Sequence, residues 1–151
     1  MDVRLVTFTL DDQRYAVMLE RVERVIRAVE PTPLPEAPPI IPGVINLAGK
    51  VVPLVDVRKR LGMPGRELDP ADHLIIARTP RRIVALAVDA VTGIMTCPEE
   101  AIVRAEQILP GLHTVGGIIT LDDGLMLIYD IDRFLALEDE RMLDQSLATT
   151  R

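Results

Sequence analysis

Several residue types are scarce in this 151-residue chain, and each shortage excludes a class of protein. The single cysteine, Cys97, allows no internal disulfide and no zinc site built on several cysteines. Its two histidines are isolated in the sequence, so we expect no metal site. Aromatic residues make up 3% of the chain and tryptophan is absent, so the core has to be built from Val, Ile and Leu.

Long apolar runs are also missing. A membrane-spanning helix needs about 20 consecutive apolar residues, and no segment of the chain approaches that length. The N-terminus lacks a basic segment followed by an apolar one, which a signal peptide would carry. We therefore expect a cytoplasmic protein without direct membrane insertion.

The charge and the motifs argue against two further functions. The formal net charge of −6 at pH 7 gives little attraction for phosphates, so we expect no nucleic-acid partner. The glycines lack the spacing of a phosphate-binding loop. Asp56 and Asp130 each follow an apolar run, and we expect them to cap short helices rather than form a catalytic pair. The sequence therefore predicts no enzyme, no catalytic residues and no cofactor.

What the chain has in quantity is short apolar runs separated by turns. Hydrophobic residues make up 48% of it. Six prolines in residues 31–42 predict an extended connector. Residues 22–26 fit either a helix or a bulged strand. Short helices are expected at 57–61 and 131–137, with the tail 138–151 continuing the second loosely. Hairpins are predicted for four pairs of segments: 5–10 with 15–17, 43–47 with 51–55, 74–77 with 83–88, and 115–121 with 125–129.

The second half of the chain repeats the first. Residues 43–56 align without a gap on residues 117–130, with matches at Gly43/Gly117, Ile45/Ile119, Leu47/Leu121 and Asp56/Asp130. The earlier hairpins align at a second constant offset, with matches at Leu5/Leu74, Ala16/Ala85 and Val22/Val91. Chance similarity among Val- and Ile-rich strands is the alternative. A repeat predicts two units of about five strands that share an apolar seam, since one such unit has a marginal core.

Two blocks of the sequence carry a resemblance to a known family. The segment 15–27, the proline-rich stretch and the block 43–58 (GVINLAGKVVPLVDVR) resemble the CheW family of bacterial chemotaxis coupling proteins, and residues 88–91 and 127–133 resemble its second half. The resemblance implies a mainly β fold of two tandem SH3-like five-stranded barrels with a shared hydrophobic core, short helices and a C-terminal helix. On this basis residues 1–151 form one domain, with subdomains at about 15–66 and 67–137. Strand 3–10 is a candidate for exchange between them, and 138–151 form a tail.

The resemblance also implies a function and partners. Members of the family are scaffolds that couple the cytoplasmic tips of chemoreceptors to the regulatory domain of a CheA-type histidine kinase. The receptor tip is a helical hairpin that lies in an apolar groove near the seam, and the kinase domain docks barrel to barrel. The protein-binding residues expected from this resemblance are Val22, Arg24, Val25, Arg27, Gly43, Val44, Asn46, Ala48 and Gly49.

Two positions depart from the family pattern. The family's turn reads Asn-Leu-Arg-Gly, whereas this chain has Ala48 in place of the arginine. Arg24 stands where the family carries glutamate. Changed surface charges alter the choice of partner more than the fold. The alternative function is therefore a divergent adaptor that has lost one interface and binds a dedicated partner outside the standard array.

Overall fold

The structure is a computed structural model that describes residues 1–104, 115–133 and 137–149. Within these ranges no helix is both long and apolar enough to span a membrane. The elements, in chain order, are β1 (Asp2–Leu10), β2 (Gln13–Met18), η1 (Leu19–Arg21), β3 (Val22–Arg27), β4 (Gly43–Leu47), β5 (Lys50–Asp56), α1 (Val57–Arg60), β6 (His73–Arg78), β7 (Ile83–Val88), β8 (Ala90–Pro98), η2 (Glu99–Ala101), β9 (Val115–Leu121), β10 (Gly124–Tyr129), η3 (Ile131–Arg133) and α3 (Leu137–Thr149).

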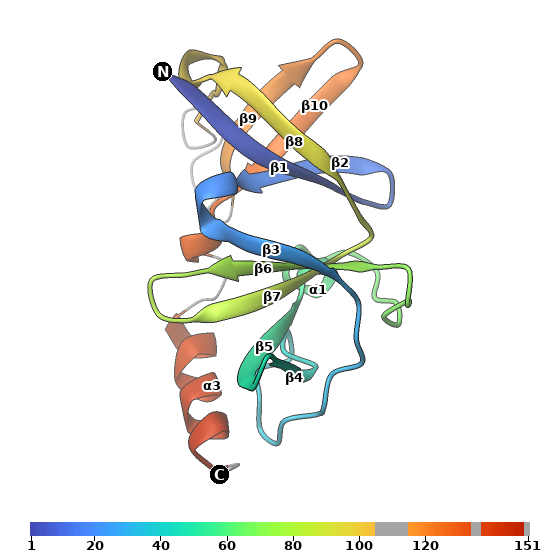
Figure 1. Ribbon diagram of the computed structural model, residues 1–151, viewed down its shortest axis with the longest axis vertical. Helices are drawn as coiled ribbons and strands as arrows, with labels where there is room; N and C mark the ends of the chain where they lie inside the picture. Colours follow the sequence, from blue (N-terminus) through green and yellow to red (C-terminus); the bar gives the residue numbers. More distant parts are fainter. Residues whose placement is uncertain (105–114, 134–136, 150–151) are drawn as a thin grey trace.

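The strands form two five-stranded sheets, one above the other in Figure 1. One sheet has the order β8-β1-β2-β10-β9 and is called barrel A here. The other has the order β3-β6-β7-β5-β4 and is called barrel B. The predicted mainly β architecture of two five-stranded barrels with a C-terminal helix is confirmed.

The strand registers follow the repeat. In barrel A, β10 and β2 run parallel, with Ile128 opposite Ala16. In barrel B, β5 and β7 run parallel, with Leu54 opposite Ala85. The two alignments seen in the sequence match Ala16 with Ala85 and Leu54 with Ile128. The two barrels are therefore built from equivalent strands in equivalent registers.

The barrels do not coincide with the halves 15–66 and 67–137 expected from the sequence. Barrel A takes β1 and β2 from the start of the chain and β8 to β10 from its end, whereas barrel B contains β3 to β7. Each repeat thus gives its whole first hairpin to the other, and the exchange involves β2 as well as strand 3–10. The exchange of strand 3–10 was expected as a candidate. A repeat pattern is the same whether a hairpin packs on its own unit or on its neighbour, so the repeat did not reveal that β2 is exchanged as well.

One hydrophobic core joins the barrels. Its largest cluster of buried residues draws on both sheets: Val6, Phe8, Leu10, Tyr15, Val17 and Tyr129 from barrel A, and Val55, Ile75, Ala77, Val84, Leu86 and Val88 from barrel B, among others. Three of the four aromatic residues of the chain lie there. The ring of Tyr15 is 5.7 Å from that of Phe8 and 5.3 Å from that of Tyr129, between ring centres. Among the described residues, the other buried members of this cluster are Val, Leu, Ile and Ala, in keeping with the composition.

The structure tests several predictions of local secondary structure. Residues 22–26 form a strand, and the register shifts between Val22 and Arg24, so the bulged-strand interpretation is right. The proline-rich connector contains no strand, only a bridge from Thr32 to Val44. Asp56 caps α1 by accepting a hydrogen bond from the Lys59 N–H at 3.1 Å. Of the predicted helix 131–137, residues 131–133 form η3, and 134–136 lie outside the described residues.

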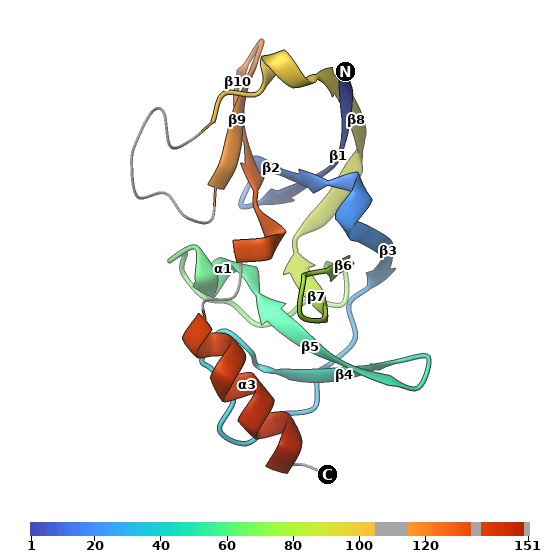
Figure 2. The same cartoon turned by 90° about the vertical axis from the view of Figure 1, so that its left-hand side faces the viewer.

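The tail is more ordered than expected from the sequence. Helix α3 lies beside barrel B, close to the β6–β7 turn and the proline-rich connector (Figure 2). Leu143 is fully buried in the shared core. Arg82 pairs with Glu140 at 3.2 Å, and the Ser146 hydroxyl donates to the carbonyl of Pro35. Leu147 also packs against that core, so both apolar and polar contacts hold the helix.

Candidate functional site

The first group of predicted binding residues lies on β3, an edge strand of barrel B. Arg24, Val25 and Arg27 are exposed, whereas Val22 is half-buried against the shared core. An edge strand offers unpaired backbone groups as well as its side chains to a partner. Val25 adds an apolar side chain that is 37% exposed. This strand is therefore well suited to docking another protein.

Gly43 and Val44 begin β4 at the opposite edge of the same sheet. Gly43 is buried, and a Cβ atom at this position would lie 2.2 Å from the carbonyl oxygen of Thr32. The backbone hydrogen bonds between Thr32 and Val44, 2.8 and 2.9 Å long, hold the connector against the strand here. Val44 is half-buried against the core. Both residues contribute to the packing of the connector, whatever else they contact.

Asn46, Ala48 and Gly49 shape the tip of the β4–β5 hairpin, and all three are exposed. Ala48 has φ of 51° and Gly49 has φ of 88°, as a tight hairpin turn requires. The side-chain oxygen of Asn46 accepts a hydrogen bond from the Gly49 N–H at 2.8 Å. Ala48 therefore presents a methyl group at an exposed tip, with a backbone conformation that glycine would adopt more easily.

Sequence reasoning did not find that a pair of exposed apolar side chains is repeated on the two barrels. Val25 on β3 is equivalent to Ile94 on β8, and Val51 on β5 is equivalent to Leu125 on β10. Their exposed fractions are 37%, 64%, 63% and 50%, in that order. Strands β3 and β8 are equivalent edge strands of the two sheets. These four residues, called the apolar pairs here, put exposed apolar side chains at equivalent positions of both barrels, on the edge strands β3 and β8 and on the inner strands β5 and β10. Applying the repeat offsets to Val25 would have located its counterpart.

A cluster of ion pairs crosses the seam between the barrels, and we call it the seam network. The guanidinium of Arg58, on α1, donates to Asp11 in the β1–β2 turn at 2.6 and 2.9 Å. It also donates to Asp89, between β7 and β8, at 2.7 and 2.9 Å. Arg66 pairs with Asp89 at 2.6 Å and with Asp72 at 2.8 Å. Arg58 is only 7% exposed, which is rare for a charged side chain and explains why it carries two carboxylate partners.

The seam network changes the acidity of its members. Hydrogen bonds from Arg58 lower the pKa of the Asp11 carboxyl. Burial alone would raise the pKa of Asp89, but hydrogen bonds from the Asp11 backbone N–H and from the guanidinium groups of Arg58 and Arg66 outweigh it, and the pKa is lowered. Both arginines have a pKa raised above the usual range by their aspartate partners, against the opposing effect of burial. Asp11, Asp89, Arg58 and Arg66 are therefore all charged at neutral pH.

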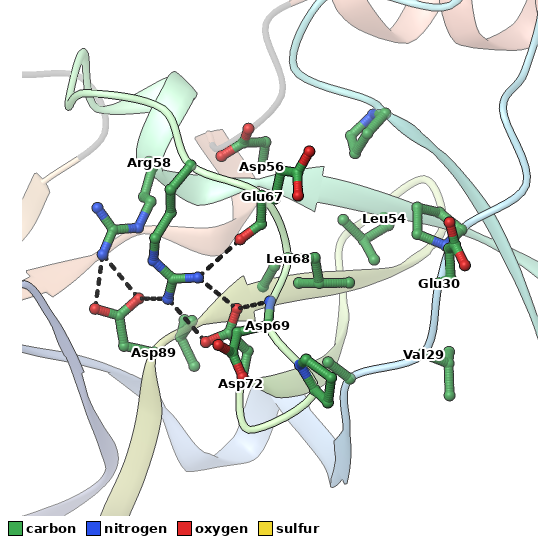
Figure 3. Close-up of a pocket in the computed structure, with 17 residues that line it drawn as sticks. Val29, Glu30, Leu54, Asp56, Arg58, Glu67, Leu68, Asp69, Asp72 and Asp89 are labelled. Atoms are coloured by element: carbon green, nitrogen blue, oxygen red, sulfur yellow. Dashed lines mark hydrogen bonds and ion pairs between the residues drawn. The ribbon is translucent and has the colours of Figure 1, made fainter.

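A hollow of about 560 Å³ opens next to the network (Figure 3). Leu54 and Leu68 line it together with Arg58, Arg66 and six acidic side chains: Glu30, Asp56, Glu67, Asp69, Asp72 and Asp89. Asp56 and Asp69 also accept hydrogen bonds from nearby backbone N–H groups. Across the residues that the structure describes, no three His, Cys, Asp or Glu side chains are grouped to hold a metal ion. Cys97 is buried, and burial raises the pKa of its thiol.

Comparison with known proteins gives one consistent result. The family model of the CheW-like domain matches residues 4–139. The probable chemotaxis protein CheW of Rhizobium etli is 31% identical over 133 residues, covering 87% of this chain and 86% of that protein. The chemotaxis protein CheW of Rhizobium meliloti is also 31% identical, over 89% of this chain and 88% of that protein.

A solved structure gives the same result for the fold. The crystal structure of the scaffolding protein TtCheW from Thermoanaerobacter tengcongensis superposes with a TM-score of 0.83 and 28% sequence identity. The match covers 92% of this chain and 96% of that chain. The arrangement of two barrels described above is thus shared with a scaffolding protein over almost the whole length of both chains.

Proposed function

Because this chain belongs to the CheW-like domain family, we propose that it is a non-catalytic cytoplasmic scaffold of bacterial chemosensory signalling. In this role it couples the cytoplasmic tip of a chemoreceptor to the regulatory domain of a CheA-type histidine kinase. The observation that carries the proposal is the repetition of an exposed apolar pair on both barrels, Val25 with Val51 and Ile94 with Leu125. A scaffold has to bind more than one protein, and a duplicated docking surface meets that need.

The chemistry of these surfaces fits protein partners. Val25 and Ile94 lie on edge strands, and exposed apolar side chains there favour docking by another barrel, because burial of the side chains supplies affinity and the strand edge supplies direction. The family resemblance implies that the regulatory domain of the kinase is also built from such barrels. The receptor tip is a helical hairpin in that family, and we assign it to the half-buried Val44 and the strand β4 that carries it.

Two exposed residues favour the alternative function, that of a divergent adaptor. Arg24 and Ala48 are both exposed, so their departures from the family pattern change the charge that a partner meets. Charge at the rim of an interface chiefly affects partner choice and association rate. A divergent adaptor with one altered interface would keep the same two barrels and bind only one of the two standard partners.

A binding experiment distinguishes these functions. The purified full chain is titrated by calorimetry with the kinase regulatory domain and, separately, with a receptor-tip fragment. Binding to both supports the coupling scaffold, and binding to one alone supports the divergent adaptor. Binding to neither overturns the proposal. The double variant Val25→Asp with Ile94→Asp serves as the control for specific docking, because it places a charge on each barrel without changing a buried residue.

A further inference from the structure

The two ends of the seam are closed by different contacts. The β1–β2 turn lies at the right of the molecule in Figure 1, and η1, the short blue helix before β3, lies at the left. At the first end, Arg58 joins Asp11 of barrel A to Asp89 through the seam network. At the second end, Arg21 on η1 pairs with Asp132 on η3 at 2.7 Å, and both side chains are partly exposed to solvent.

The repeat relates the residues at one end of the seam to those at the other, so the two ends can be compared position by position. The alignment of residues 43–56 on 117–130, continued along the chain, relates Arg58 to Asp132. The alignment of the earlier hairpins relates Asp89 to Glu20. One end of the seam thus has a guanidinium and a carboxylate where the other has two carboxylates. Two carboxylates repel each other and cannot form the same clamp. The seam network therefore belongs to one end only and is not a consequence of the duplication.

The geometry of the network suits it to fixing an orientation. Apolar contacts across the shared core attract without direction. A planar guanidinium that hydrogen-bonds carboxylates holds them at a defined distance and angle. Arg58 on barrel B reaches Asp11 in the turn of barrel A, and the backbone N–H of Asp11 donates to Asp89 at 2.8 Å. The Asp89 N–H in turn donates to the carbonyl of Thr9 at 3.1 Å.

From this arrangement we propose that Arg58 and Asp89 are positioning residues that fix the orientation of barrel A relative to barrel B. The apolar pairs lie on different barrels, so the same contacts set the angle between a partner on Val25 and one on Ile94. This consequence rests on the proposed scaffold function. The proposed orientation of the barrels does not depend on that function, and it can be measured on the protein alone.

Distance measurements between spin labels test the orientation. Labelled cysteines replace Lys50 in barrel B and Asp122 in barrel A, both exposed, in a chain with Cys97→Ala. We expect a single narrow distance distribution in this parent and at least a twofold broader one after Arg58→Met. The matched control, Arg21→Met at the other end of the seam, should keep the parent's width. A distribution for Arg58→Met as narrow as the parent's overturns the proposal.

Milder variants keep the test decisive if Arg58→Met fails to fold. That variant removes the guanidinium partner of Asp11 and leaves Asp89 paired with Arg66 alone. Asp11→Asn removes one charge at an exposed side chain, and Asp89→Asn removes the central carboxylate. Both should broaden the distribution by less than Arg58→Met but beyond the Arg21→Met control. Narrow distributions in both asparagine variants overturn the proposal.

A second measurement tests the consequence for signalling. Binding of Arg58→Met or Asp89→Asn to the kinase regulatory domain and to the receptor-tip fragment, each alone, should stay within threefold of the parent. Receptor-dependent kinase stimulation should fall at least tenfold. Lost binding to a single partner would mean that these residues act by contact, which contradicts positioning. If the parent itself binds neither partner, the scaffold function fails, while the spin-label result still decides the orientation.

Discussion

Val25 and Ile94 occupy equivalent positions on the edge strands of the two barrels, as the alignment of the repeats places them, and both side chains are exposed. Duplication alone conserves the position of a strand but not the exposure of an apolar side chain, which costs solubility. The agreement between the two barrels therefore points to the same use on both, namely docking of a partner.

The first prediction concerns these two residues. Ile94→Asp and Val25→Asp should each weaken binding of a barrel-shaped partner by tenfold or more, because a charge would be desolvated in an apolar contact. Unfolding free energy should change by less than about 0.5 kcal/mol, as is usual for surface positions. Titration calorimetry and urea denaturation measure the two effects. The control is Ala148→Asp, which makes the same charge change at an exposed position of α3. An equal loss of affinity in this control would contradict a specific docking surface.

The second prediction compares two equivalent glycines. A Cβ on Gly43 would meet the backbone oxygen of Thr32 at 2.2 Å, and one on Gly117 would meet the side chain of Ile102 at 2.5 Å. A side chain can move more easily than a backbone carbonyl. Gly43→Ala should therefore cost about 3 kcal/mol or more of unfolding free energy and Gly117→Ala about 1 kcal/mol, within the range for overpacking. Urea denaturation measures both.

The control for the glycine pair is Gly65, where an added Cβ would meet no atom within 4 Å. Gly65→Ala should be neutral or stabilising by about 0.5 kcal/mol, because alanine restricts the unfolded chain. Equal losses in Gly43→Ala and Gly65→Ala would show that the close approach at Thr32 does not limit this position.

The third prediction is acid sensitivity of the seam network. Asp11 and Asp89 have a lowered pKa in the folded chain, whereas an aspartate in the unfolded chain titrates near about 3.9. Their contribution to stability is therefore complete above about pH 5 and is lost as the pH falls through the folded pKa values. Thermal unfolding at constant ionic strength should show a melting temperature that declines below about pH 4. Asp89→Asn should melt lower at pH 7 and decline less steeply, and parallel profiles would contradict the network's role.

The fourth prediction concerns the exposed hairpin tip. Ala48→Arg restores the cation of the family pattern and should raise affinity for a partner with an acidic counterpart by about two- to fivefold, the size of an exposed ion pair. Calorimetric titration measures this change, with Ala48→Gln as the uncharged control. Unchanged or weaker affinity for both candidate partners counts against a family-type contact at this tip.

The local features of the fold could be predicted because their causes are close in sequence. Asp56 caps the helix that it precedes, and the residues Ala48 and Gly49 form the turn that separates two apolar runs. The repeat was also visible, since matching residues recur at constant offsets. Exchange of strand 3–10 was a candidate, but exchange of both whole hairpins was not visible, because it depends on which of two equivalent surfaces a hairpin contacts.

The seam network lay beyond sequence reasoning for a related reason. Arg58 stands 47 residues from Asp11 and 31 residues from Asp89, and no local pattern marks any of the three as a partner. The segment containing Arg58 contributed to the family resemblance without suggesting a role for the side chain. Its burial and its partners follow only from the way in which the two barrels meet.

The reciprocal exchange of hairpins has a consequence for how the chain matures during synthesis. Barrel B, made of β3 to β7, has all its strands once the ribosome has passed Val88, whereas β2 meets its neighbour β10 only after β8 and β9 have also been made. The β1–β2 hairpin is therefore made before barrel B and gains its neighbour β10 after it. Until then the nascent polypeptide displays the apolar faces of β1 and β2, a natural substrate for the chaperones that attend emerging chains.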